Sequence, residues 1–150
     1  MFKAFYGFSQ DPFSKDMDVK HQFKSQDFSC GLSRLEFLKN TLGFGLLTGE
    51  PGVGKTFLLR CFVSSLNPNL FKYVYIPIST LTVMEFYRAL CNGLGVIPCF
   101  KKVDMFRQIQ ESIYTYRQSK NITPVIIIDE AQFVKNQVLD DLRIIFNFEM

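Results

Sequence analysis

Residues 44–59 read FGLLTGEPGVGKTFLL, and this stretch decides the fold. An apolar run ends at Gly49, four residues intervene, and Gly54, Lys55 and Thr56 then open a segment with the apolar spacing of a helix. Glycines allow backbone torsions that a Cβ would block, so successive N–H groups can point at a polyphosphate. The N-terminus of the following helix adds its own amides. The pattern therefore predicts a phosphate-binding loop between a strand and a helix.

The residue types in this loop predict two chemical roles. Lys55 is expected to reach the β and γ phosphates, and the Thr56 hydroxyl is expected to ligate Mg²⁺. The alternative is a glycine-rich strand-to-helix turn that binds no ligand, but a complete motif between strand-like and helix-like segments disfavours it. The expected nucleotide-binding residues are Gly49, Glu50, Pro51, Gly52, Val53, Gly54, Lys55, Thr56 and Phe57.

A second acidic element follows a continuous apolar run. Residues 124–128, PVIII, predict a strand covered on both faces, as in a parallel sheet between layers of helices. Asp129 and Glu130 come next, at the end of the strand where ligands bind in such sheets. Asp129 is expected to hold Mg²⁺, directly or through its water shell, and Glu130 to orient the water that attacks the γ phosphate. The alternative is an exposed Asp-Glu turn that caps the next helix.

Two neighbouring carboxylates also separate classes of nucleotide-binding protein. Nucleotide kinases and signalling GTPases do not usually pair the metal-binding aspartate with an adjacent water-activating glutamate, whereas motor-type ATPases do. The pair Asp129–Glu130 therefore favours ATP hydrolysis coupled to a conformational change.

The composition indicates one globular domain. The chain has 150 residues and a net charge of +3, which permits contact with nucleic acid or anionic lipid without arguing for it.

Its four cysteines lack Cys-x-x-Cys spacing and its one histidine is His21, so a zinc site has no ligands at usable spacing. Free thiols in a reducing cytoplasm are expected, although a disulfide between Cys91 and Cys99 stays open. No signal peptide or membrane-spanning run is visible, which predicts a soluble, cytoplasmic protein.

The rest of the chain predicts alternating strands and helices. Strands are expected at 44–48, 71–78 and 124–128, and residues 15–29 are expected to be loop. A short helix is expected from Leu32 with Ser29 or Ser33 as its cap, and another helix follows the loop, with Asn67-Pro68-Asn69 stopping it. Further helices are expected from the capping box of Thr82 and Glu85 to about Asn92, from a cap at Asp104 to near Asn121, and over 136–146. The helical faces expected to be buried are Phe57, Leu58, Cys61, Phe62 and Leu66; Met105, Phe106, Ile109, Ile113 and Tyr116; and Val138, Leu139, Leu142, Ile145 and Phe146.

The N-terminus is unusually aromatic. Five aromatic residues fall within residues 2–13, and Gly7 and Pro12 interrupt them, so we expect an ordered cap on the domain and not a regular helix. Phe8, Pro12 or Phe13 are candidates to wall an adenine pocket, and simple cover of the core is the alternative for each.

Three stretches together resemble a known family. They are FYGF at 5–8 with Pro12-Phe13, GEPGVGKT at 49–56, and IIIDEAQ at 126–132. They look like the AAA+ ATPases of the general secretion pathway protein A type and the related ATPases encoded by transposons and insertion elements. The resemblance implies a three-layer α/β P-loop NTPase fold, with Gly49–Thr56 as the Walker A motif and Asp129 and Glu130 as the Walker B pair. It also implies ATP and Mg²⁺ as ligands, assembly with like subunits, and a partner in DNA transposition or secretion.

The resemblance covers only the front half of such a module. Members of the family order their strands 5-1-4-3-2, and the fourth strand, the sensor residue, the arginine finger and the helical lid would all follow Met150. Arg143 is the only arginine after Asp129. The interpretation is therefore a single, partial ATPase domain, with residues 1–30 as aromatic cap and loop and residues 31–150 as nucleotide-binding core. A helicase-type nucleic-acid motor fragment and an ATP-binding remnant that does not hydrolyse remain as alternatives.

Overall fold

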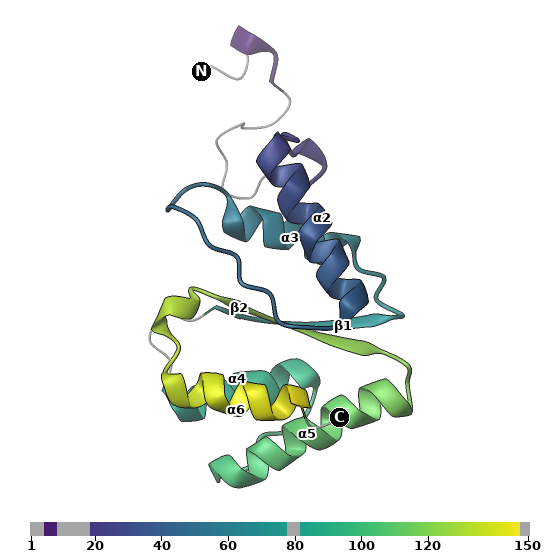
Figure 1. The fold of residues 1–150 in the computed structure, drawn as a ribbon, viewed down its shortest axis with the longest axis vertical. Helices are drawn as coiled ribbons and strands as arrows, with labels where there is room; N and C mark the ends of the chain where they lie inside the picture. The colour runs from purple at the N-terminus through teal and green to yellow at the C-terminus, as the bar shows by residue number, and fades with distance from the viewer. Residues whose placement is uncertain (1–4, 9–18, 78–81, 148–150) are drawn as a thin grey trace. The chain divides into compact units, whose positions relative to one another are not determined.

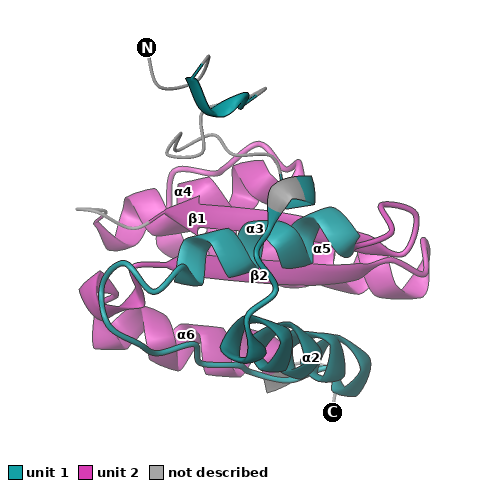
Figure 2. Ribbon diagram, turned by 90° about the horizontal axis from the view of Figure 1, so that it is seen from above, with its two compact units in different colours: residues 1–65 teal, residues 66–150 magenta. Residues whose placement is uncertain are grey.

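The computed structural model describes residues 5–8, 19–77 and 82–147. In chain order its elements are η1 (Val19–His21), α2 (Gln26–Thr41), α3 (Lys55–Ser65), β1 (Phe71–Pro77), α4 (Val83–Leu94), α5 (Lys102–Gln118), β2 (Thr123–Asp129), η2 (Ala131–Phe133) and α6 (Asn136–Asn147) (Figure 1). The chain divides into two compact units, Met1–Ser65 and Leu66–Met150 (Figure 2).

In the first unit, helix α2 begins three residues before the first expected serine cap. The Ser25 side chain accepts a hydrogen bond from the Phe28 amide at 3.1 Å, and Leu42 ends the helix in the left-handed region with φ of 52°. The predictions of a loop through Ser29 and of a cap at Ser29 or Ser33 are wrong. Those two hydroxyls instead donate to carbonyls four residues earlier, since polar residues are tolerated along the exposed face of a helix.

Helix α3 packs closely against α2 through a glycine. A Cβ at Gly31 would lie 2.7 Å from Leu58 Cδ2, so a larger residue there would have to displace the Leu58 side chain. Leu58, Cys61 and Phe62 are buried, which confirms most of the predicted apolar face of α3, whereas Phe57 is half-buried and the buried Leu66 follows the end of the helix. The expected stop after the helix is also confirmed, because the Asn67 carbonyl and side chain accept the amides that turn the chain into β1.

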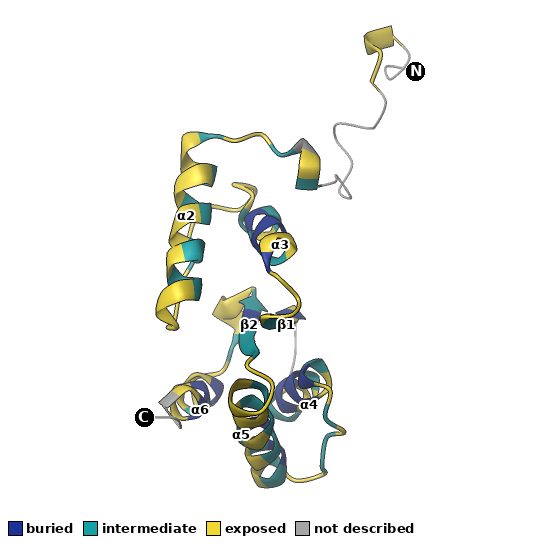
Figure 3. Cartoon of the chain, turned by 90° about the vertical axis from the view of Figure 1, so that its right-hand side faces the viewer, coloured by how far each residue is buried: buried dark blue, intermediate teal, exposed yellow. Residues whose placement is uncertain are grey.

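In the second unit, β1 and β2 form a parallel pair with Tyr75 opposite Ile127 and Pro77 opposite Asp129. This confirms the α/β class with a parallel sheet, and both strands fall where they were expected. Helices α4, α5 and α6 lie on the same face of this pair (Figure 3). The buried core between them comprises Val74, Ile76, Phe86, Tyr87, Leu90, Cys91, Leu94, Met105, Ile109, Val138, Leu142 and Ile145.

The helix boundaries in this unit follow the sequence with one exception. The capping box of Thr82 and Glu85 is confirmed, and Gly95 ends α4 with φ of 80°. The prediction that Asp104 caps α5 is wrong, because the helix begins two residues earlier. Lys101 is its N-cap and makes no side-chain capping bond, so Asp104 lies in the first turn, where its charge favours the helix dipole.

The prediction of a strand over residues 44–48 is wrong. The sheet of the described residues contains only β1 and β2, and Phe44 and Leu46 are 63% and 82% exposed. An apolar run becomes a strand only when a neighbouring strand pairs with its backbone. The neighbour that the family resemblance implies is a fourth strand, which is not among the described residues.

Several side chains are more exposed than predicted. In β2 only Ile127 is buried and the other residues are half-buried, so the strand is less buried than its continuous apolar run predicts. Leu139 and Phe146 of α6 are 49% and 42% exposed, and they fall outside the buried face of that helix.

Three aromatic residues of the predicted N-terminal cap are among the described residues. The ring of Tyr6 contacts those of Phe5 and Phe8, and all three side chains are exposed, so the ordered cap stays a prediction. Pro12 and Phe13 lie outside the described residues.

Candidate functional site

The predicted phosphate loop has the backbone of an anion-binding turn. Gly52 and Gly54 have φ of 85° and 90°, in the left-handed region that side chains disfavour. A Cβ built on either glycine meets nothing within 4 Å, so the backbone on this side is open to a ligand. Helix α3 begins at the next residue, Lys55, and its N-terminal amides and dipole favour a negative charge there.

The Lys55 side chain, at the end of this loop, is hydrogen-bonded to the backbone at its start. Its ammonium donates to the carbonyl oxygens of Gly49 at 2.8 Å and Glu50 at 2.9 Å. The Lys55 side chain thus reaches back to a carbonyl six positions earlier in the chain and closes a ring, with a positive charge held beside open glycine backbone. An ammonium group has three donors, so it can exchange carbonyl oxygens for phosphate oxygens without changing its charge. The residues present therefore fit a polyphosphate.

The remaining predicted loop residues are accessible. Glu50, Pro51, Val53 and Thr56 are exposed, and Phe57 is half-buried. The ring of Phe57 packs 6.4 Å from that of Phe28, centroid to centroid.

Helix α3 is anchored to α2 at both of its ends. The Phe28–Phe57 pair lies near its start, and the Ser65 hydroxyl donates to Glu36 Oε1 at 3.2 Å at its end. Glu36 also forms an ion pair with Lys39. Because the phosphate loop leads directly into α3, these contacts set the position of the loop within the first unit.

The predicted acidic pair lies in the second unit, at the carboxyl end of β2. Asp129 is the last residue of the strand, and each of its oxygens accepts a hydrogen bond. The Tyr75 hydroxyl donates to Oδ2 at 2.5 Å, and the Glu130 amide donates to Oδ1 at 3.0 Å. The carboxylate is thus fixed by a side chain from β1 and by the backbone of its own chain.

Glu130 has a backbone conformation that is unusual for its type. Its φ of 57° and ψ of 43° place it in the left-handed region, a conformation that costs a non-glycine residue on the order of 1–3 kcal/mol. The Gln132 amide donates to Glu130 Oε2, and the Phe133 amide donates to the Glu130 carbonyl at 3.0 Å. This turn holds an exposed carboxylate immediately beyond the strand, where a water-orienting group is expected.

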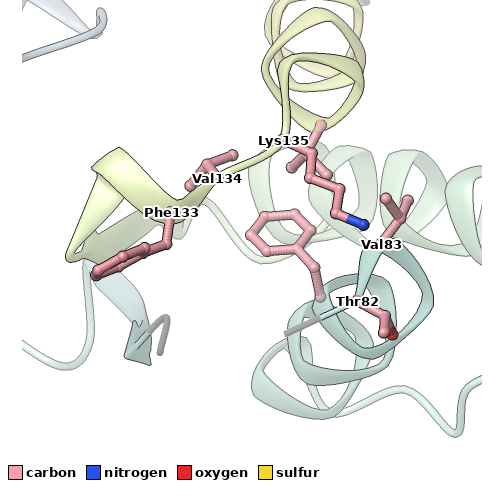
Figure 4. A pocket seen from close by; sticks show the side chains of 7 residues that line it. Thr82, Val83, Phe133, Val134 and Lys135 are labelled. Carbon is pink, nitrogen blue, oxygen red and sulfur yellow. The ribbon is translucent and has the colours of Figure 1, made fainter. Parts of the chain in front are cut away.

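Neither of two hollows in the second unit contains a predicted site residue. The first lies between the start of α4 and the segment that leads into α6, with Phe133 and Lys135 on its rim (Figure 4). Its volume of about 10 Å³ holds about one water molecule. The second, of about 340 Å³, lies where the end of α4 meets α5, beside Gln108 and Tyr116.

The structure brings the predicted residues together in two groups. Gly49, Glu50 and Lys55 are in direct contact in the first unit, and Asp129 and Glu130 are in contact in the second. Within the described part of the chain, no three Cys, His, Asp or Glu residues are grouped as a metal site. This does not exclude magnesium at the predicted ligands, because Mg²⁺ keeps several waters and needs only one or two protein oxygens beside phosphate.

Sequence reasoning missed Tyr75 and Gln132, the partners of the acidic pair. The alternation Lys72-Tyr73-Val74-Tyr75-Ile76 does place both tyrosines on the face opposite Val74, but only the observed register with β2 brings Tyr75 to Asp129. No signal in the sequence indicates that the side-chain amide of Gln132 donates a hydrogen bond to the Glu130 carboxylate.

Comparison with known proteins adds a family and a relative. Residues 39–150 match the family described as AAA domain. The chain is 31% identical over 153 aligned positions to General secretion pathway protein A of Aeromonas hydrophila. The alignment covers 99% of this chain and 27% of that relative, so the chain spans about a quarter of the relative's length. No solved structure matches. None of the helices in residues 5–8, 19–77 and 82–147 combines the length and hydropathy needed to cross a bilayer.

Proposed function

This chain belongs to the AAA domain family of ATPases, and from that premise we propose that it binds ATP with Mg²⁺ and hydrolyses it to change the state of a partner. The observation that supports the proposal most directly is the pair of hydrogen bonds from the Lys55 ammonium to carbonyl oxygens of the phosphate loop. A lysine held by loop carbonyls at the start of a helix, beside two glycines with positive φ, is a preformed receptor for a polyphosphate.

We assign roles to the residues by their chemistry. The backbone amides of Gly49–Thr56, with the neighbouring Phe57, hold the nucleotide, and Lys55 exchanges its carbonyl partners for phosphate oxygens. The Thr56 hydroxyl and the Asp129 carboxylate are the proposed Mg²⁺ ligands. When bound, Mg²⁺ neutralises charge on the phosphates.

Glu130 is the proposed catalytic base. Its carboxylate orients a water molecule and accepts the proton that the water loses as it attacks. Gln132 donates a hydrogen bond to the same carboxylate, which restrains one of its two oxygens.

The partner is proposed from the named relative. General secretion pathway protein A is a secretion protein by its name, so we propose a secretion-related assembly for this chain. A role in DNA transposition predicts a different property, namely DNA binding that weakens steeply with salt. Titration with duplex DNA at 50 and 200 mM salt therefore separates these two assignments.

Nucleotide binding is tested by calorimetric titration with Mg-ATP. We expect binding by the unaltered chain and a loss of at least about tenfold in affinity for Lys55→Ala, since that change removes a charge-assisted contact of about 1.5–3 kcal/mol. Lys101→Ala is the matched control, because Lys101 is an exposed lysine in the second unit. Equal affinity for both variants would contradict the proposed site.

Hydrolysis is tested separately by phosphate release. We expect Glu130→Gln to keep nucleotide affinity and to lower turnover by about a hundredfold or more, the usual contribution of a general base. If the unaltered chain binds ATP without releasing phosphate, it is a nucleotide-binding module only, and the hydrolytic part of the proposal is wrong.

A further inference from the structure

The contact between Tyr75 and Asp129 is built into the register of the parallel strands. Tyr75 lies opposite Ile127, and Asp129 is two residues further along β2, so the two side chains share a face of the sheet. Their oxygens are 2.5 Å apart, within the range of about 2.5–2.7 Å for a hydroxyl that donates to a carboxylate anion. Such bonds are about twice as strong as those between neutral groups.

The two hydrogen bonds on Asp129 act on different oxygens. The Tyr75 hydroxyl holds Oδ2 and the Glu130 amide holds Oδ1. Two donors on two oxygens fix the plane of the carboxylate as well as its direction. Loss of the Tyr75 hydroxyl removes one of these two constraints on rotation about the Cβ–Cγ bond, a torsion with a broad energy minimum. A carboxylate accepts about four hydrogen bonds, so these two are compatible with a metal ion or its water shell.

We propose that Tyr75 is a positioning residue, which holds the Asp129 carboxylate in the orientation that receives Mg²⁺ with the nucleotide. This inference rests on the proposed function. Groups that orient a metal ligand in this way usually contribute about tenfold or more to metal affinity. In this role Tyr75 acts through its hydrogen bond to Asp129, so its loss weakens the binding of Mg²⁺ with the nucleotide and not the nucleotide contacts themselves.

The same strand supplies a matched control. Tyr73 lies two residues earlier on the same face of β1 and is 51% exposed, against 39% for Tyr75. Replacing either tyrosine by phenylalanine removes one hydroxyl and leaves the ring. The pair Tyr75→Phe and Tyr73→Phe therefore separates the hydrogen bond to Asp129 from any general effect of a lost hydroxyl on this face.

The test measures ATP affinity by calorimetry at increasing free Mg²⁺ and again in EDTA. We expect Tyr75→Phe to raise the Mg²⁺ concentration for half-maximal binding about tenfold, with affinity in EDTA within about twofold of the unaltered chain. Tyr73→Phe is expected to match the unaltered chain. In an Asp129→Asn background, Tyr75→Phe is expected to add no further loss, because the group it positions is already gone.

The outcomes distinguish this inference from the proposed function. If the unaltered chain shows Mg²⁺-dependent binding that Asp129→Asn weakens, but Tyr75→Phe behaves as Tyr73→Phe does, the positioning role is overturned and the proposed function stands. If the unaltered chain binds no nucleotide, both are overturned.

A spectroscopic measurement keeps the inference testable should Tyr75→Phe not fold. In the chain labelled with 3-fluorotyrosine, the fluorine signal of Tyr75 is assigned by elimination from single Tyr→Phe changes at the other five tyrosines. We expect Mg-ADP to shift this signal in the unaltered chain and to leave it unchanged in Asp129→Asn. A Tyr75 signal that shifts equally in both, or in neither, overturns the positioning role.

Discussion

The Tyr87 hydroxyl donates a hydrogen bond to the Asp141 carboxylate and so joins α4 to α6. Tyr87 is fully buried, and Lys102 of α5 forms an ion pair with the same carboxylate at 2.6 Å. The Lys102 ammonium also lies 5.3 Å from the centre of the Tyr87 ring. Burial and the bond to Asp141 raise the pKa of Tyr87, so its hydroxyl remains a donor. Three helices of the second unit thus meet at one polar contact beside the apolar core.

Tyr87→Phe is expected to lower the free energy of unfolding by about 1–3 kcal/mol. The change keeps the buried ring but removes a hydrogen bond to a charged group, and Asp141 keeps its ion pair with Lys102. Urea unfolding followed by circular dichroism measures the difference. Tyr114→Phe on α5 is the control, because Tyr114 is 51% exposed and its change should cost less than about 0.5 kcal/mol. Equal losses for the two variants would show that the buried contact adds no stability.

The Asp141 contact also predicts how stability changes with pH. Partial burial raises the pKa of Asp141, but the hydrogen bonds from Lys102 and Tyr87 and the charge of Lys102 outweigh it, so the net pKa is lowered. A pKa lowered by folding stabilises the fold above the unfolded value of about 4, and this contribution is lost as the pH falls through the folded value. Asp141→Asn should therefore destabilise most at pH 7.

Urea unfolding of the unaltered chain and Asp141→Asn between pH 7 and pH 3 checks this sign. The difference in unfolding free energy should shrink as the pH falls below about 4. The neighbouring exposed residue supplies a control, Asp140→Asn. A difference between Asp141→Asn and the unaltered chain that does not vary with pH would rule out the ion pair as its origin.

Local signals in the sequence predicted most of the second unit correctly. The capping box of Thr82 and Glu85 and the apolar run before Asp129 each depend on neighbouring residues, so each could be interpreted from the sequence. The parallel pairing also followed, because a continuous apolar run is typical of a strand in such a sheet.

Features that depend on distant partners could not be predicted in this way. Residues 44–48 have the apolar pattern of a strand, but a strand requires a neighbour that no local pattern supplies. The bond from Tyr75 to Asp129 spans 54 residues and depends on the register of β1 against β2. The candidate ligands were therefore found from their motifs, whereas the residue that holds one of them was not.

Gly54→Ala is expected to weaken nucleotide binding by about tenfold without unfolding the chain. Gly54 has φ of 90° and open space around a built Cβ, so alanine there meets no clash but strains the backbone by roughly 1–2 kcal/mol. If the loop changes its conformation to relieve that strain, its backbone amides move away from the ligand. The control is Gly43→Ala, whose Cβ would lie at an ordinary 3.5 Å from Leu38 Cδ1. Calorimetric titration with Mg-ATP compares the two variants, and equal affinities would show that the glycine conformation does not matter for binding.

Gly93 permits a close approach of α4 to β1, and Gly93→Ala is expected to destabilise the second unit. A Cβ there would lie 2.2 Å from Val74 Cγ1, a distance that forces one of the two elements to move. Overpacking of this kind costs about 1–3 kcal/mol, against a gain of about 1 kcal/mol from the higher helix propensity of alanine. Urea unfolding measures the net loss, and Asn92→Ala on the exposed side of the same helix reports the propensity gain alone.

A double-mutant cycle with Val74→Ala identifies the cause of that loss. Val74→Ala removes the methyl group that the new Cβ would meet, at the cost of a cavity in the core. In that background Gly93→Ala should cost less than in the unaltered chain, because the 2.2 Å contact is gone and the contact at 3.2 Å with the Cβ of residue 74 remains. The two changes should therefore couple by about 1 kcal/mol or more, as residues in contact do. Additive losses would mean that the tight contact between Gly93 and Val74 does not limit the packing of α4 on β1.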